Sequence, residues 1–456
     1  MDVIDEAEVL DESGAPDVDA TDEPAASENA DAREHEPAAS EAPSPRVPVG
    51  ARLVAWVRGL PGRARTYVRG TPHRALEYVR GTPQRLLLPP LAEGERRRIV
   101  SIDALRGLAL AGMLMVNNLP RAGTPPLWLE HVDWEGLRFA DVVFPAFLFV
   151  AGVSLAFSFG GRRKQHWVWV WLHFLFRVAA LVVIGLALNH FTYGEPLRIP
   201  GVLQRIGLSL LLAAPFARLK PGWIAAAGAV FLAAHTAMLF LWIPPGGIDP
   251  ALRSFESLPL YVDTTVFGIE HLHWSGFDPE GLLGLVSSAG QVLLGAAVGS
   301  ALHRHPREGR WLLWLGIAGA AAFIGGWALE PTLPIVKRLW TASFVLVTSG
   351  GATMLLVAFY AIADWLRGER WIAWLAPLGR NALTAYVGSA ALTMWLYSVM
   401  VVGPTGATLN AVGIFSTALV TAFGPATGAI AYSAAHVLVW YAVTAALDRA
   451  RVYVKL

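Results

Sequence analysis

One histidine in this chain stands among residues that suit it to proton transfer. His131 lies in the stretch Trp128-Leu-Glu-His-Val-Asp-Trp-Glu-Gly136, between tryptophans and carboxylates. An imidazole can take and return a proton near neutral pH. Asp141 opens the next apolar run, where its carboxylate could hold one ring nitrogen and fix the tautomer. The pattern predicts catalysis at His131 with Asp141; the alternative is an exposed polar residue in a loop.

An arginine inside an apolar segment needs a partner, because a charge in hydrocarbon is costly. Gln204 and Arg205 end the stretch Arg198-Ile-Pro-Gly-Val-Leu-Gln-Arg205 and are followed by apolar residues. A ligand phosphate or carbonyl would satisfy the guanidinium, and so would the carboxylate of Asp141 or Glu195. Both kinds of partner stay open, and Gln204 and Arg205 are candidate binding residues.

A further pair of charges opens the first apolar run. Asp103 and Arg106 are three residues apart, so they share one face of a helix and can pair with each other. The pair is either a structural ion pair near a helix start or part of a polar path through the membrane. We therefore keep both residues as candidate binding residues.

Other polar residues interrupt or border the later apolar runs. Asp278 precedes Pro279, which is typical of a helix start. Lys337 precedes another run, and Asn381 follows Pro377 within an apolar stretch. That last pattern predicts either a kink lining a polar cavity or a loop between shorter helices. Asp278, Lys337 and Asn381 complete the predicted binding set.

Several classes of chemistry are excluded or disfavoured. The chain has no cysteine, which removes disulfides, thiolate metal sites and cysteine nucleophiles. It has no P-loop, no His-Glu-x-x-His zinc helix and no Gly-x-Ser-x-Gly elbow. The formal net charge is +1, so bulk charge does not indicate a nucleic-acid partner. We expect no metal and no nucleic acid.

Long apolar runs must position these residues. Only 16% of the residues are charged and the mean hydropathy is +0.46, whereas soluble chains are about 25% charged. The runs reach about 20 residues, the length that crosses a bilayer. They predict an all-α, polytopic transmembrane bundle of about ten helices, with a loop and a short interfacial helix over 403–423. The expected spans are 101–119, 137–159, 168–190, 201–218, 223–243, 281–302, 311–329, 339–364, 371–400 and 428–447.

Basic residues predict the orientation of the bundle. If Arg96–Arg98 is cytoplasmic, the basic loops alternate with loops poorer in Lys and Arg, and both termini are cytoplasmic. Residues 1–48 are acidic and lack aromatic side chains, so we expect a disordered tail. Residues 49–98 are basic and form either a membrane-surface segment or a solvated linker. The transmembrane domain is predicted over 99–456.

Ordered motifs across the domain resemble one family, the heparan-α-glucosaminide N-acetyltransferases, which are multi-pass membrane enzymes. The likeness runs from residue 99 to the C-terminus. It is carried by Ser101-Ile-Asp-Ala-Leu-Arg-Gly107 with Val116-Asn117, His131 to Gly136, Ala140-Asp-Val-Val-Phe-Pro145, Arg198 to Arg205, Asp278-Pro-Glu-Gly-Leu-Leu283, Leu339-Trp-Thr-Ala-Ser-Phe344 and Leu378-Gly-Arg-Asn-Ala-Leu383.

The resemblance implies a reaction and roles for particular residues. It implies transfer of an acetyl group from cytoplasmic acetyl-CoA to an amine or hydroxyl of a glycan beyond the membrane. The family's histidine falls on His131, its asparagine on Asn117 and its aspartate on Asp141. His131 would act as general base or as a transient acyl carrier, and these routes stay open. The resemblance also implies a homodimer.

The composition and the open alternatives complete the prediction. Richness in Ala, Arg and Pro is typical of a high-GC bacterium, which predicts an inner-membrane protein. A secondary transporter with an Asp/Arg polar pathway is the main alternative. A membrane scaffold that recruits partners through residues 1–95 is another. Loss of function on changing His131, but not on deleting residues 1–95, would favour the acetyltransferase.

Overall fold

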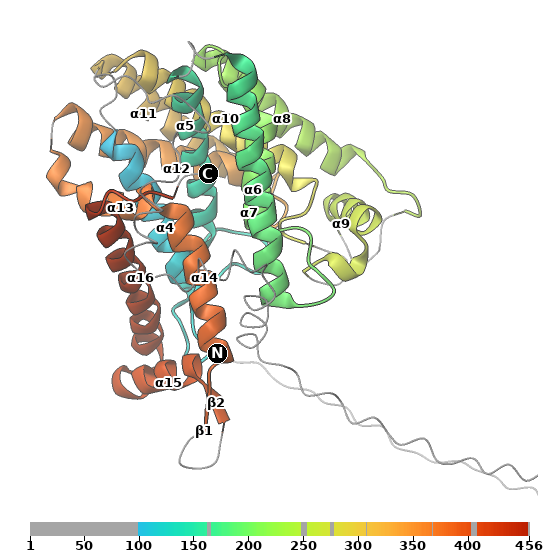
Figure 1. Cartoon of the computed structure of the whole chain (residues 1–456). Helices are drawn as coiled ribbons and strands as arrows, with labels where there is room; N and C mark the ends of the chain where they lie inside the picture. Colours follow the sequence, from blue (N-terminus) through green and yellow to red (C-terminus); the bar gives the residue numbers. More distant parts are fainter. Residues whose placement is uncertain are drawn as a thin grey trace, which may run out of the picture. The chain divides into compact units, whose positions relative to one another are not determined.

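The described part of the chain is almost entirely helical, as the sequence predicts. The computed structural model describes residues 99–161, 166–247, 253–273, 278–306, 308–366, 368–402 and 408–454. The predicted tail, 1–48, and the basic segment, 49–98, lie outside these residues. Within them the only sheet is a two-stranded antiparallel hairpin, and the rest of the regular structure is helix (Figure 1). The all-α bundle is confirmed.

The helices follow the apolar runs closely, because a backbone in lipid must satisfy its own hydrogen bonds. The α-helices are α4 (Val100–Asn117), α5 (Phe139–Gly161), α6 (Trp167–Tyr193), α7 (Val202–Ala213), α8 (Pro221–Leu241), α9 (Ser254–Phe267), α10 (Gly284–Arg304), α11 (Gly309–Ala328), α12 (Ala342–Tyr360), α13 (Ala376–Arg380), α14 (Ala382–Ser398), α15 (Ala411–Phe423) and α16 (Pro425–Arg449). Strand β1 (Met400–Val402) pairs with β2 (Thr408–Asn410), and Met400 lies opposite Asn410.

Eight of the described helices are long and apolar enough to cross a membrane: α4, α5, α6, α8, α10, α11, α12 with its π-helical extension to Trp365, and α16. Two of the predicted spans are not single crossing helices in the structure. The predicted span 201–218 is α7 with a 3₁₀ turn, Ala214–Phe216, and is shorter than a typical crossing helix. The predicted span 371–400 is broken at Asn381, which separates α13 from α14. The short helix predicted within 403–423 is α15.

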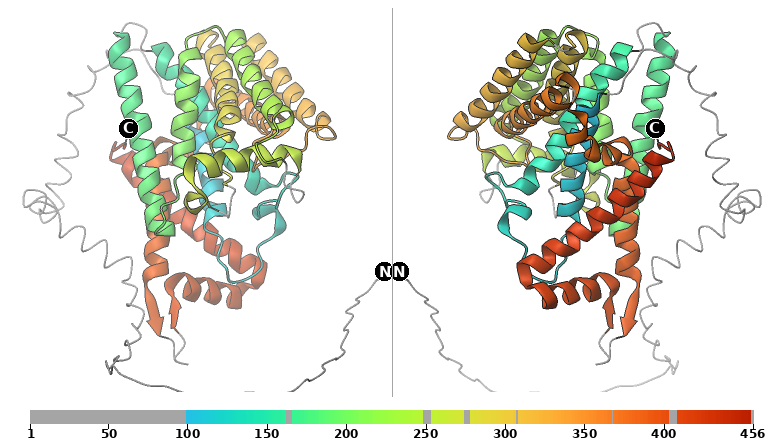
Figure 2. Two further views of the ribbon diagram at one scale, coloured as in Figure 1. Left: turned by 90° about the vertical axis from the view of Figure 1, so that its right-hand side faces the viewer. Right: turned by 90° about the vertical axis from the view of Figure 1, so that its left-hand side faces the viewer.

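Helix α10 lies at the centre of the bundle, in contact with α5, α7, α8 and α12 (Figures 1 and 2). It is 89% buried, far more than the outer helices α6 and α11. Small residues let α5 approach it closely. A Cβ atom built on Gly295 would lie 2.1 Å from the carbonyl oxygen of Phe149, and one on Gly152 would lie 2.1 Å from that of Val292. The two backbones therefore touch, as in other small-residue membrane interfaces.

A second close contact explains the break in the predicted 371–400 span. A Cβ atom on Gly379 would lie 1.9 Å from the carbonyl oxygen of Asp103, so α13 rests directly on the backbone of α4. This short helix begins at Ala376 with Pro377 in its first turn, and Asn381 caps its C-terminal end with φ −116° and ψ 34°. The chain then turns into α14. Hydropathy averaged over the whole span does not register this break, because long apolar stretches flank Arg380 and Asn381 on both sides.

The α5–α10 contact generates a stability prediction. Gly295→Ala places a methyl group against a backbone carbonyl, so the helices must separate. Overpacking of this kind typically costs about 1–3 kcal/mol. We expect a lower melting temperature for the detergent-solubilised variant. Gly325→Ala, on α11, is the matched control because no atom lies within 4 Å of its added Cβ. Equal melting temperatures for the two variants would contradict the close packing.

Candidate active site

The side chain of His131 is held by a buried carboxylate. Its Nδ1 lies 2.9 Å from Oδ1 of Asp141, in the first turn of α5. The other oxygen, Oδ2, accepts the backbone N–H groups of Val132 and Arg138, each at 3.2 Å. The Asp141 side chain is 1% exposed and that of His131 is 47% exposed. The acid is thus fixed while the imidazole remains accessible, which suits a base that meets an external substrate.

Lys337 joins this pair from a distant part of the sequence. Its Nζ lies 2.8 Å from Nδ1 of His131 and 3.4 Å from Nε2. It also lies 3.3 Å from Oδ1 of Asp141. Burial lowers the pKa of Lys337 below that of an exposed lysine, although the neighbouring Asp141 opposes the shift. The sequence marked Lys337 as a binding residue, but nothing in its surroundings predicted contact with His131.

The segment that carries Lys337 is pinned on both sides. The backbone N–H of Gly136 donates to the carbonyl of Ile335 at 2.9 Å, and Glu135 forms a bridge with Val336. On the far side lies Trp340, which is 1% exposed and has a left-handed backbone with φ 57°. Such a conformation is rare for a bulky residue and needs support from its surroundings. The segment therefore positions Lys337 against the His131 loop.

Trp340 receives that support from α10 and α7. Its indole Nε1–H donates to Oε1 of Gln291 at 2.9 Å, and its carbonyl accepts the hydroxyl of Ser287. The guanidinium of Arg205 stacks over its ring, 4.2 Å from the centroid. A cation over an indole face is stabilising, particularly away from water. Trp340 thus links the predicted residue Arg205 to the Lys337 segment.

Arg205 finds polar partners other than the carboxylates considered from the sequence. Its Nε donates to the hydroxyl of Ser288 at 2.7 Å, and Nη1 donates to the carbonyl of Pro279. Its side chain is buried, and Nη2 has no hydrogen-bond partner among the described residues. The neighbouring Gln204 donates to the carbonyl of Ile199 at 3.1 Å. One arm of the guanidinium is therefore available to a ligand.

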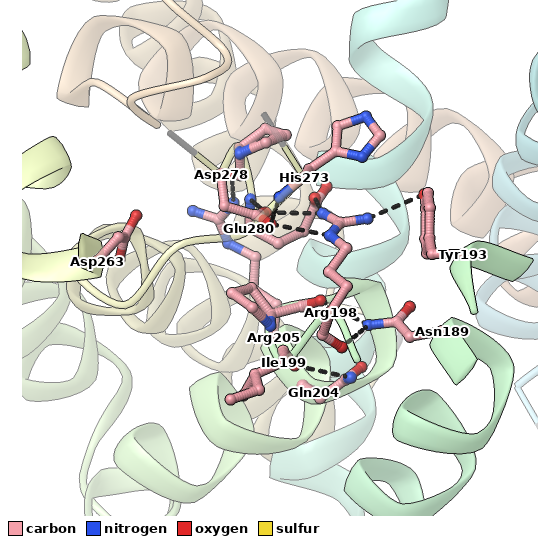
Figure 3. Close-up of polar contacts among 12 residues, drawn as sticks. Asn189, Tyr193, Arg198, Ile199, Gln204, Arg205, Asp263, His273, Asp278 and Glu280 are labelled. Carbon is pink, nitrogen blue, oxygen red and sulfur yellow. Dashed lines mark hydrogen bonds and ion pairs between the residues drawn. The ribbon is translucent and has the colours of Figure 1, made fainter. Parts of the chain in front are cut away.

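A buried ion pair closes the loop before α7, as Figure 3 shows. Arg198 donates from Nε and Nη2 to the two oxygens of Asp278, at 2.8 and 2.7 Å, and also reaches Glu280. Burial alone would lower the pKa of Arg198, but the bonds to Asp278 outweigh it and raise that pKa. Asp278 also accepts the backbone N–H groups of His273 and Glu280, each at 2.9 Å. Both carboxylate oxygens of the predicted binding residue Asp278 therefore have hydrogen-bond partners within the protein.

Comparison with known proteins identifies the family. Residues 98–331 match the family described as heparan-alpha-glucosaminide N-acetyltransferase, catalytic. The chain belongs to this family. The match contains His131, Asp141, Arg205 and Asp278, and the resemblance stated from the motifs is confirmed. Residues 297–436, which contain Lys337 and Asn381, also match a family described as a protein of unknown function, DUF418.

Two mammalian proteins of this family are similar to the chain. The chain is 27% identical to the human heparan-alpha-glucosaminide N-acetyltransferase over 360 residues, which cover 64% of this chain and 52% of the human one. It is 27% identical to the mouse protein of the same name over 372 residues, covering 67% and 55%. The chain thus spans about half the length of these curated relatives.

The predicted pair Asp103–Arg106 lies at the other end of α4 from the His131 loop. Arg106 Nη1 is 3.5 Å from Asp103 Oδ1, and Arg380 Nε is 3.4 Å from Asp103 Oδ2. Arg380 in turn pairs with Asp448 at 2.7 Å. Because a helix rises 1.5 Å per residue, Asp103 is about 20 Å from Asn117 along α4. These charges bind α4, α13 and α16 together, away from His131.

The predicted asparagines differ in their surroundings. Asn117, the last residue of α4, is exposed. Its neighbour Asn118 is buried and donates to the carbonyl of Leu114 at 2.6 Å and to the hydroxyl of Ser389 at 3.2 Å. The sequence did not predict this difference between the two adjacent asparagines. Asn381 is also completely buried, and neither atom of its amide has a hydrogen-bond partner within the described ranges. Buried amides without partners are uncommon and point to a missing ligand or water.

Metal ligation has no geometric basis in the part of the chain that the structure describes. There, no three or more His, Asp or Glu side chains gather in a way that could hold an ion.

The buried ion pair gives a second stability prediction. Asp278→Asn leaves Arg198 buried without its full counter-charge, and breaking a buried pair typically costs about 3–5 kcal/mol. We expect a large fall in melting temperature. Glu270→Gln is the matched control: it removes the same charge from a side chain that is 57% exposed and 3.8 Å from His271. If the two variants melt alike, the ion pair contributes nothing to holding the loop.

Proposed function

We propose that this protein is a membrane acetyltransferase. It transfers an acetyl group from cytoplasmic acetyl-CoA to an amine or hydroxyl of a sugar or glycan on the outer face of the membrane. The observation that carries the proposal is the accessible His131 held by buried Asp141, inside the region that matches the catalytic family. The relatives are named as acetyltransferases of heparan-alpha-glucosaminide, which supports an amino-sugar acceptor.

The reaction needs one proton carrier near the acceptor. In direct transfer, the nitrogen of the acceptor amine attacks the thioester carbonyl carbon. At the same time, Nε2 of His131 takes a proton from that amine. The C–S bond then breaks, and the imidazolium returns the proton to the departing CoA thiolate. In the covalent route, Nε2 attacks the thioester carbonyl carbon and the C–S bond breaks to release CoA thiolate. The acceptor amine then attacks the acetyl carbon, the bond to Nε2 breaks, and the amine proton passes to the freed imidazole. Asp141 holds the Nδ1 proton in both routes.

The positions of the basic loops support delivery of acetyl-CoA from the membrane face opposite His131. Arg304, at the end of α10, donates to the carbonyl of Leu219 at 2.8 Å, so the α7–α8 and α10–α11 connections meet. Ser287 and Ser288, near the start of α10, contact Trp340 and Arg205. These ends of α10 are about 25 Å apart, close to the thickness of a bilayer core. We place the basic end in the cytoplasm, facing the phosphates of acetyl-CoA.

Unpartnered polar groups mark positions for the rest of acetyl-CoA and for the developing charge. Nη2 of Arg205 and the amide of Asn381, which lack hydrogen-bond partners among the described residues, are suited to carbonyl and amide groups of the donor. Exposed Asn117 would donate to the oxyanion of the thioester carbonyl. Asp103, Arg106 and Asp278 already have protein partners, so they support the helices that carry the site. Gln204 donates to Ile199, but its Oε1 has no hydrogen-bond partner among the described residues.

The setting of the enzyme follows from the same proposal. We propose a bacterial inner-membrane protein with both termini in the cytoplasm, acting as a homodimer. Residues 99–456 would form the transmembrane enzyme, preceded by a basic segment over 49–98 and an acidic tail over 1–48. A secondary transporter would instead need a continuous polar path, whereas Asp103 is paired with both Arg106 and Arg380.

The proposal is tested with purified, detergent-solubilised protein. The assay measures the release of free CoA from acetyl-CoA in the presence of each of a panel of amino sugars. His131→Gln should lower acceptor-dependent turnover by about 10²–10⁴-fold, the usual contribution of a general base. His190→Gln is the matched control, since His190 also pairs with a carboxylate, Glu195 at 3.0 Å, but both side chains are exposed. Equal turnover in His131→Gln and wild type would remove His131 from the mechanism.

Two further outcomes of this assay are informative. A burst of CoA without acceptor, equal in amount to the enzyme and absent in His131→Gln, would establish the covalent route. No acetyl-CoA binding by a well-folded protein would contradict the acetyltransferase and favour the transporter, which predicts solute flux independent of CoA.

A further inference from the structure

A small polar cavity lies between α8, α9 and the loop that leads into α10, and none of the proposed chemistry is placed there. It offers about 10 Å³ to the centre of a water molecule, which is room for one such molecule. The polar side chains in its wall are those of His235, Asp263, Asp278 and Arg338. Asp278 is paired with Arg198, and Arg338 lies over an indole ring. His235 and Asp263 therefore decide what the cavity can hold.

His235, on α8, brings a buried ring nitrogen without a partner to this cavity. The residue is 1% exposed, and its Nδ1 has no hydrogen-bond partner among the described residues. An imidazole nitrogen is always either a donor or an acceptor. Buried groups of this kind almost always have a partner, which is an ordered water where the protein supplies none. The wall position of His235 indicates that the partner of Nδ1 lies in the cavity.

Asp263 reaches the same cavity from α9. It is 1% exposed, and its Oδ1 accepts the backbone N–H of Leu282 at 2.8 Å. Its Oδ2 lies against Gly281, where a Cβ atom would collide with it. Figure 3 shows the carboxyl group apart from the Arg198–Asp278 pair. Burial raises the pKa of Asp263 to about 6, and the charge of Asp278 adds to the shift. Its partner must therefore suit both a carboxylate and a carboxylic acid.

We propose that one buried water molecule occupies this cavity and bridges Nδ1 of His235 to the carboxyl group of Asp263. Water both donates and accepts hydrogen bonds, so it suits either tautomer of His235 and either form of Asp263. The cavity is polar and offers several partners, as a buried water requires. The inference concerns a site outside the proposed reaction and does not depend on it.

Other occupants fit the wall less well. A chloride ion would face the carboxyl groups of Asp263 and Asp278. A metal ion would find no set of three His, Asp or Glu ligands among the residues that the structure describes, and it would lie near the charge of Arg338. An apolar group would leave Nδ1 of His235 unsatisfied. Water satisfies the wall without any of these costs.

The bridge would fasten α9 to α8, and α9 is also joined to the His131 loop. Arg253, the N-cap residue of α9, forms an ion pair with Glu135 and a capping box with Glu256. Helix α9 is therefore held at its start by the His131 loop and at Asp263 by the cavity wall. Loss of the water should loosen α9 while the paired charges at its start remain.

Hydrogen–deuterium exchange of the full-length protein in nanodiscs tests the bridge without substrate or turnover. His235→Leu removes Nδ1, so we expect the amides of α9 to exchange about fivefold faster, the effect of losing one hydrogen bond of typical strength. His235→Asn keeps a polar group near the position of Nδ1 and should restore most of the protection. Thr236→Val is the matched control, because the hydroxyl of this next residue also lacks a partner in the described part of the chain. Wild-type exchange of α9 in His235→Leu would overturn the inference.

The water itself is visible by cryo-electron microscopy of the same nanodisc samples at a resolution that shows ordered solvent. We expect one density peak within about 2.7–3.2 Å of both Nδ1 of His235 and an oxygen of Asp263. The peak should remain in chloride-free buffer and disappear in His235→Leu. An empty cavity, or a peak that vanishes when chloride is withdrawn, would refute the bridge. Since neither measurement involves acetyl-CoA, failure of the proposed function would leave this result standing.

Discussion

The close contact between α5 and α10 is the constraint on which the site depends. With backbones touching at Gly295 and Gly152, the start of α5 and the start of α10 are fixed relative to each other. Asp141 belongs to the first of these ends, and Gln291 on α10 anchors Trp340. Helix packing therefore brings the acid and the Lys337 segment to the same end of the bundle, and the contacts of Glu135 and Gly136 with residues 335–336 complete their placement. Small residues here serve the chemistry through geometry alone.

The buried polar groups near this contact fall into two classes, those with hydrogen-bond partners and those without. The first kind, such as Arg198 with Asp278, is completely paired, as a charge away from water requires. The second kind, Nη2 of Arg205 and the amide of Asn381, has no partner within the described residues. Because buried polar groups usually have hydrogen-bond partners, these two groups are candidates for contact with a ligand or water. This contrast is what distinguishes the groups available to a ligand from those that hold the helices.

The sequence predicted the helices well because apolar length is a direct physical signal of membrane crossing. It also predicted His131 with Asp141, since the two are close along the chain. It did not predict Lys337 at His131, because the residues are 206 positions apart and only tertiary packing joins them. The break at Asn381 was left open because it depends on the contact between Gly379 and α4. The partners of Arg205 were missed since a hydroxyl and a carbonyl carry no charge signal.

The placement of Asp141 in the first turn of α5 has a consequence for the choice of acceptor. A helix start carries partial positive charge, which favours a carboxylate there. With the ammonium of Lys337 beside it, the His131–Asp141–Lys337 group has no net charge when the ring is neutral. Once Lys337 is neutral, the same group carries one negative charge facing a half-exposed imidazole. An approaching amino sugar, itself a cation in water, is then attracted electrostatically to the buried carboxylate behind His131.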